Sequence, residues 1–112
     1  MKLPMMFQAE VIDVGALVVV KLCGELDLAS VERLRAVERR VADANNPVVF
    51  DLADLEFIDV AGIRALVATV DRLRSWGRAV AVCSVPPWTR KVAELVGVSS
   101  YLGEVEFVSS PG

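Results

Sequence analysis

Two apolar segments near the start of the chain are separated by a short break at Gly15. Residues 7–13 partly alternate between apolar and polar positions, and residues 16–23 are almost continuously apolar. This pattern is typical of an antiparallel hairpin whose second strand is buried on both faces. We therefore expect the chain to begin with two paired strands.

Two later segments repeat apolar residues every three or four positions. Residues 31–44 carry apolar side chains on one face and charged ones on the other, and the stretch between Asp59 and Trp76 has a similar spacing. Both patterns predict amphipathic helices. Ser30 and Asp59 precede the two segments, and both residue types are common helix N-caps.

Short apolar runs at residues 48–52 and 79–83 predict two further buried strands. Pro86-Pro87 then introduces a third helix, because proline is tolerated in a first turn, and Gly97 stands where a glycine commonly ends a helix. Residues 101–108 are expected to close the fold as a short strand or a docked segment.

The predicted order is therefore β-β-α-β-α-β-α, followed by an uncertain last strand. It defines an α/β fold with a mostly parallel sheet, an antiparallel N-terminal edge strand and three to four helices. A length of 112 residues suits one hydrophobic core. We expect a single domain over residues 1–112, with a core from about residue 7 to residue 107 and a frayed end at residues 109–112.

The net charge and the hydropathy of the chain limit the kinds of partner and the compartment that we expect. The formal net charge of −3 offers no basic field for nucleic acid phosphates. The longest apolar stretches, such as residues 16–20, fall far short of the about 20 residues that a membrane span needs. Residues 1–7 lack the apolar region of a signal peptide. These features predict a cytoplasmic protein that neither binds nucleic acid directly nor spans a membrane.

The candidate chemistry points away from catalysis. The chain has no histidine and neither of the two common glycine-rich phosphate motifs. Clustered carboxylates could suggest a cation site or an acid and base pair, but we favour Asp54 and Glu56 on a solvated loop and Asp59 as a helix cap. The cluster consists of Asp51, Asp54, Glu56 and Asp59. We expect no metal, no cofactor and no enzymatic activity.

Two segments stand out because each follows a predicted parallel strand. They are residues 24–28, Gly-Glu-Leu-Asp-Leu, and residues 57–62, Phe-Ile-Asp-Val-Ala-Gly. The carboxyl ends of parallel strands emerge at one edge of a sheet, where ligands and partners usually bind. We call this edge the carboxyl rim, and it is the candidate functional site.

The same two segments resemble the STAS domain family, as found in bacterial anti-sigma factor antagonists. Residues 24–27 look like the family's Gly-Glu-Leu-Asp stretch. Residues 59–62 look like its Asp-Ser-Ser-Gly or Asp-Ser-Thr-Gly stretch, which follows an Asp-Leu strand end matched here by Asp51-Leu52. Residues 90–102 resemble the family's last helix and closing segment. The resemblance extends from about residue 7 to residue 107.

The resemblance implies that the domain binds an anti-sigma factor, usually a kinase of the histidine-kinase-like ATPase fold, and so frees a sigma factor. The residues it implies for partner binding are Glu25, Asp27, Asp59, Val60, Ala61, Gly62 and Arg64. In that family, phosphorylation of a serine or threonine just before the motif glycine switches the antagonist off.

This chain departs from the family at the regulated position. Ala61 occupies the phosphoacceptor position and Val60 precedes it, so neither residue has a hydroxyl group; Arg64 replaces what is commonly a small residue. A phosphate at this helix start would add close to two negative charges beside Asp59. We expect an antagonist that always binds or answers to another input; the alternative is a helix start that has lost its regulated surface.

Cys23 and Cys83 are expected to be reduced, buried thiols, and both are expected to end strands at the rim. A disulfide between them could control partner binding through oxidation in place of phosphorylation. Strands on either side of a central strand lie about 10 Å apart, however, whereas a disulfide needs Cα atoms within about 7 Å.

Two other functions remain open at this point. The chain could be a STAS subunit of a stress-signalling complex or of a lipid transporter. A small-molecule or nucleotide sensor is the weakest alternative, because the rim lacks phosphate-binding loops. For the antagonist, we expect a monomer or a weak dimer.

Overall fold

Four strands and three α-helices alternate along residues 6–102, the part of the chain that the computed structural model describes. The strands are β1 (Gln8–Val14), β2 (Leu17–Leu26), β3 (Val48–Ile58) and β4 (Val80–Cys83). The helices are α1 (Val31–Val41), α2 (Val60–Ser75) and α3 (Pro87–Leu95), with short 3-10 helices η1 (Leu28–Ser30) and η2 (Ser99–Leu102). The predicted element order is confirmed.

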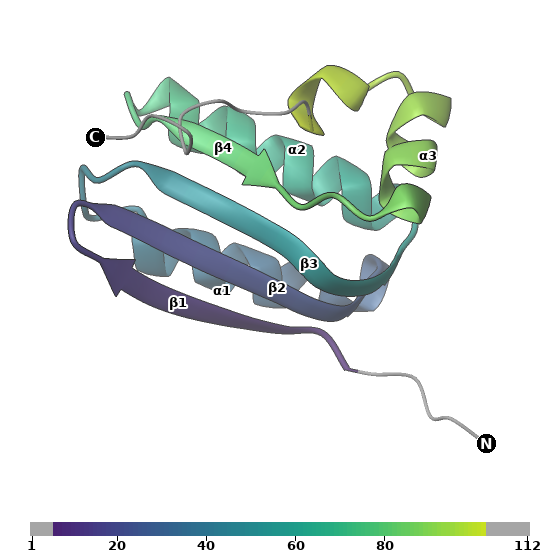
Figure 1. Ribbon diagram of the computed structural model, residues 1–112, viewed down its shortest axis with the longest axis horizontal. Coiled ribbons are helices and arrows are strands. Elements are labelled where there is room, and N and C mark those ends of the chain that lie inside the picture. Colours follow the sequence, from purple (N-terminus) through teal and green to yellow (C-terminus); the bar gives the residue numbers. More distant parts are fainter. Residues whose placement is uncertain (1–5, 103–112) are drawn as a thin grey trace.

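The strands form one sheet in the order β1-β2-β3-β4. β1 pairs antiparallel with β2, and Gly15, with a φ of 64°, closes the turn between them in a conformation that glycine adopts readily. β3 pairs parallel with both β2 and β4. Figure 1 shows α1 and α2 together behind the sheet, and α3 beside the end at which β2, β3 and β4 finish. The mostly parallel sheet with an antiparallel edge is therefore confirmed.

The prediction that the second strand is buried on both faces is wrong. Along β2, buried side chains alternate strictly with half-buried ones. Val18, Val20 and Leu22 belong to the core cluster, whereas the intervening Val19 and Lys21 are half-buried. The continuous apolar run concealed this difference because both kinds of position are filled by aliphatic side chains.

β3 is six residues longer than the run that predicted it. Its pairing with β2 shifts register twice, between Lys21 and Cys23 and between Gly24 and Glu25 of β2. Each shift leaves an extra residue in β3, as in a β-bulge. Asp54 and Glu56 are exposed as expected, but they lie within this strand and not on a loop.

The first of these irregularities has a side-chain support. The Asp51 carboxylate accepts a hydrogen bond from the Ala53 backbone N–H, with 3.0 Å between Oδ1 and N. A backbone donor that leaves a strand ladder needs another partner. Asp51 therefore stabilises the bulged part of β3, which is a structural role and not that of a cation ligand.

The core lies between the sheet and the two helices behind it. Its largest fully buried side chains are Phe50, Leu22, Leu26, Leu34, Leu52, Ile58, Ile63, Leu66, Leu73 and Leu102. These side chains come from β2, β3, α1, α2 and η2, so strands and helices both contribute apolar residues to one core. In α2, the apolar residues Ile63, Leu66, Val70 and Leu73 are buried, as their spacing predicts, whereas Val67 is half-buried.

An ion pair between the buried Glu38 and the half-buried Arg72 joins α1 to α2. The Glu38 carboxylate accepts hydrogen bonds from the Arg72 guanidinium at 2.6 and 2.7 Å and from the Thr69 hydroxyl at 2.9 Å. Burial of the Glu38 carboxyl disfavours its charged form, but these hydrogen bonds and the positive charges of Arg72 and Arg35 outweigh that effect and lower its pKa. The pair thus fixes how the two helices lie against each other.

α1 ends at Val41, three residues before the predicted end. The buried Arg78 guanidinium donates to the Val41 carbonyl at 2.6 Å and to the Asn46 carbonyl at 2.9 and 2.6 Å. Carbonyl groups at a helix end lack partners within the helix. Arg78 supplies a hydrogen-bond donor to the last carbonyl group of α1 and connects the α1–β3 loop to the segment that leads into β4.

The third helix begins at Pro87 and is followed by Gly97, as predicted. Gly97 has a φ of 78°, and the Val98 N–H donates to the Ala93 carbonyl at 2.9 Å, which is the hydrogen bond of a Schellman motif. Residues 99–102 form η2, and the rest of the predicted closing segment, residues 103–108, lies outside the described residues. No helix in the described range is long and apolar enough to cross a membrane.

Candidate functional site

The carboxyl rim forms where β2 and β3 end side by side. Leu26 at the end of β2 is paired with Ile58 at the end of β3. Gly24, which has a φ of 85°, occupies the second register shift, and its conformation lets the last residues of β2 pair with β3 again. The structure therefore brings the two motif segments together, although residues 24–26 belong to β2 and residues 57–58 to β3, and not to the loops after these strands.

The start of α2 lies directly against the end of β2. The Leu26 carbonyl accepts a hydrogen bond from the Asp59 N–H at 3.3 Å. A Cβ atom at Gly62 would lie only 2.1 Å from the same carbonyl oxygen and 2.9 Å from the Ile58 side chain. The motif glycine is thus required by close backbone approach, and Gly62 itself is buried.

Asp59 caps α2, as predicted. Its Oδ1 accepts a hydrogen bond from the Gly62 N–H at 2.7 Å, and its carbonyl accepts one from the Ile63 N–H at 2.9 Å. A carboxylate at this position also interacts favourably with the positive end of the helix dipole. Val60, in the first turn, is exposed, whereas Ala61 is half-buried.

Ser30 occupies the N-cap position of α1, as predicted, but its side chain makes no capping hydrogen bond. The hydroxyl group is shared between the Asp27 carboxylate at 2.8 Å and the Glu25 carbonyl at 3.0 Å. Ser30 therefore holds the half-buried Asp27 side chain close to the backbone of its own loop. The following residue, Leu28, is exposed.

The rim carries an aromatic pair that the sequence analysis did not identify. Phe57 and Trp88 stack with their ring centroids 6.2 Å apart and an angle of 21° between the ring planes. The Trp88 indole N–H donates to the Ile58 carbonyl at 3.2 Å, and both aromatic side chains are exposed. The sequence feature that could have indicated the pair is Trp88 itself, which directly follows Pro86-Pro87 shortly after a predicted strand ends at the rim.

The two cysteines do not meet. Cys23 and Cys83 form no disulfide with each other, and both are half-buried on strands that flank β3, so the expectation that these thiols are buried is wrong. Their partners on β3 are Asp54 and Asp51, and two strand spacings alone separate them by about 10 Å. Cys83 ends β4 as expected, but Cys23 lies three residues before the end of β2.

Two hollows lie on the surface away from the first turn of α2. One, of about 490 Å³, is bordered by Gln8, Cys23, Ala53, Asp54, Leu55 and Glu56. The other, of about 350 Å³, lies at the far end of the sheet, with an apolar floor that includes Val11, Val18 and Val41. Within residues 6–102, no group of three or more acidic or cysteine side chains is arranged to hold a metal ion.

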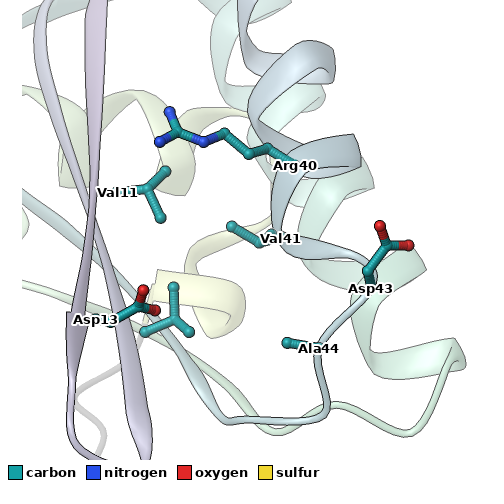
Figure 2. A pocket seen from close by; sticks show the side chains of 7 residues that line it. Val11, Asp13, Arg40, Val41, Asp43 and Ala44 are labelled. Atoms are coloured by element: carbon teal, nitrogen blue, oxygen red, sulfur yellow. The ribbon is translucent and has the colours of Figure 1, made fainter.

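Figure 2 shows the far hollow, into which Arg40 extends from α1 above Val11. Asp13 borders it from β1, and Asp43 points away from the strands. The hollow also lies at the C-terminal end of α1, which is the negative end of the helix dipole. The two carboxylates and the negative end of the helix dipole make this hollow unfavourable for a phosphate group, unlike a nucleotide-binding loop.

Comparison with known proteins identifies the family to which this chain belongs. The model of the STAS domain matches residues 8–110, and the chain belongs to that family.

A protein of Bordetella bronchiseptica, BtrV, whose name proposes an anti-sigma factor antagonist, is 28% identical over 88 residues, which cover 78% of this chain and 76% of that protein. An anti-sigma factor antagonist from Mycobacterium paratuberculosis superposes with a TM-score of 0.75 at 26% identity, over 87% of this chain and 83% of that one. The unphosphorylated form of the anti-sigma factor antagonist SpoIIAA shares the fold, with a TM-score of 0.72 at 22% identity over 96% of this chain and 99% of that one.

Proposed function

We propose that the chain is an anti-sigma factor antagonist that binds an ATPase-type anti-sigma factor at its carboxyl rim and thereby releases a sigma factor. The observation that carries the proposal is the junction at Leu26, which holds the Asp27 loop and the Asp59-capped start of α2 against each other. Both motif segments thus contribute to one surface. The names of the similar proteins support the same function.

The rim acts without phosphorylation at the usual position. Ala61 and Val60 have no hydroxyl group, so a kinase partner has no acceptor at the start of α2. A phosphate there would add close to two negative charges beside the Asp59 carboxylate. The protein therefore stays competent to bind for as long as it is present, and it acts in the cytoplasm by binding and not by catalysis.

The test is a calorimetric titration against each ATPase-type anti-sigma factor of the host, with ATP and with ADP. The variants are Ala61→Glu, which places a negative charge at the helix start, and Ala61→Ser, which restores a hydroxyl group. Ala36→Glu is the matched control, because Ala36 lies on the exposed side of α1. We expect the wild type and Ala36→Glu to bind and Ala61→Glu to lose binding.

The Ala61→Ser variant tests the kinase part of the proposal. It should bind with ADP, and with ATP it should become phosphorylated and be released. Failure of the wild type to bind any of these anti-sigma factors would overturn the proposal and favour a subunit of a larger assembly. Equal binding by Ala61→Glu and Ala36→Glu would show that the partner docks elsewhere.

A further inference from the structure

The stacked rings of Phe57 and Trp88 form an exposed apolar surface at the rim. Val60, in the first turn of α2, is also exposed and follows Phe57 by three residues. We refer to these three side chains as the aromatic patch. All three lie outside the hydrophobic core cluster.

The pair is held in place by the backbone of the motif itself. The Trp88 N–H is satisfied by the Ile58 carbonyl, one residue before the Asp59 cap. Pro87 at the start of α3 fixes the backbone immediately before the tryptophan. The polar group of the indole is therefore occupied, and the exposed part of the ring offers mainly apolar contact area.

The elements that carry and adjoin the patch also carry charged residues of opposite sign. Glu25 and Asp27 lie on the β2 side. Arg64 follows Val60 by one turn of α2, and Lys91 follows Trp88 by one turn of α3, and both are exposed. An apolar centre with a charged border is the usual anatomy of a protein interface.

We propose that the aromatic patch is the anchor of the anti-sigma factor interface, with Trp88 as its main contact. This inference rests on the proposed function and adds the chemistry of the partner. The partner presents an apolar pocket or loop, with basic groups toward Asp27 and acidic groups toward Arg64. Aromatic side chains at the centre of an interface commonly carry most of its binding energy.

The chain supplies a closely matched control for the key substitution. Trp88 is 53% exposed and Trp76 is 54% exposed, and Trp76 lies beyond the opposite end of α2. Trp88→Ala and Trp76→Ala therefore remove similar side chains with similar exposure from opposite ends of the domain. Leu28→Ala and Leu95→Ala form a second pair, since these leucines are 74% and 78% exposed.

The measurement is the dissociation constant for the anti-sigma factor that binds the wild type. We expect Trp88→Ala to weaken binding by about 30-fold or more, whereas Trp76→Ala changes it by less than about threefold. Trp88→Phe, which keeps a ring for the stack, should retain more affinity than Trp88→Ala. Val60→Gln tests the patch without altering either ring, and we expect it to weaken binding by about tenfold.

The possible results separate the two proposals. If the wild type binds but Trp88→Ala and Trp76→Ala behave alike, the aromatic anchor is overturned and the proposed function stands. If the wild type binds no anti-sigma factor, both are overturned. If Trp88→Ala leaves partner affinity unchanged and instead converts a dimer to a monomer in light scattering, the patch joins two copies of this chain and the anchor is again overturned.

Discussion

Replacing Gly62 with alanine tests the close junction between β2 and α2. In a helix, alanine is normally favoured over glycine by about 1 kcal/mol. Here the added Cβ would lie 2.1 Å from the Leu26 carbonyl oxygen, so the helix start must retreat by about 1.3 Å to reach an ordinary contact of 3.4 Å. Gly62 is the position at which helix preference and packing make opposite predictions.

The packing cost is expected to win. Overpacking in a close-packed interior costs about 1 to 3 kcal/mol, and the atom in the way is a strand carbonyl and not a flexible side chain. With about 3 kcal/mol for the clash and about 1 kcal/mol gained in helix preference, the free energy of unfolding falls by about 2 kcal/mol. For a domain of this size, the melting temperature should then fall by roughly 10 °C.

The assay is urea unfolding followed by far-ultraviolet circular dichroism, with Gly15→Ala as the control. Gly15 also resists substitution, but for a different reason, since its φ is 64° and a Cβ there would meet no atom within 4 Å. Its cost is therefore about 1 kcal/mol from the backbone alone. A Gly62→Ala protein as stable as the wild type, or more stable than Gly15→Ala, would refute the argument from close approach.

Three further predictions concern the ion pair of Glu38 and Arg72, the buried Arg78 and the cysteines. The pKa of Glu38 is lowered on folding, so its contribution to the free energy of unfolding is present above the pKa of an unfolded glutamate and is lost as the pH falls through the lower folded value. We expect Glu38→Gln to be less stable than the wild type by about 2 kcal/mol at pH 7 and to lose less stability in acid. Urea titrations from about pH 7 to pH 3 measure both effects, and parallel curves for the two proteins would contradict this prediction. Arg78→Met removes the hydrogen bonds to the Val41 and Asn46 carbonyl groups and should lower the free energy of unfolding by about 2 to 3 kcal/mol, whereas an unchanged urea midpoint would contradict the stabilising role of Arg78. Under mild oxidation of the folded monomer, Cys23 and Cys83 should remain titratable as two thiols, and an internal disulfide found by mass spectrometry would overturn the strand separation.

The helices and the order of the elements along the chain could be predicted from sequence because each element has a local cause. α2 has regular apolar spacing, Asp59 supplies its cap, and Trp76-Gly77 marks its end. The loops of the rim could be placed because parallel strands finish at the same edge. These features depend on residues close together in the chain, which is why the pattern alone located them.

The true length of β3 could not be found in the same way. Leu52, Leu55 and Ile58 are buried at intervals of three residues, whereas an uninterrupted strand alternates every two. The register shifts against β2 produce this spacing, and they depend on a partner strand about thirty positions away. Phe57 consequently reached the surface at a place where no local pattern indicated a strand.

The aromatic patch and the buried charges were missed for a similar reason. Nothing around Trp88 states whether its ring is buried or exposed, and only the fold places it beside Phe57. Glu38 falls on the charged face of the predicted first helix, and the sequence pattern does not pair it with Arg72. Their pairing requires α1 and α2 to lie on the same face of the sheet, which the spacing within either helix does not determine.

The Leu26 carbonyl has a consequence for the thermodynamics of recognition. It accepts the Asp59 N–H and limits the space at Gly62, so the ends of two strands and the start of a helix form one preorganised unit. Little conformational entropy remains to be lost there when a partner binds. Such a surface is better controlled by changes of charge at its edge, or by the amount of protein made, than by opening and closing.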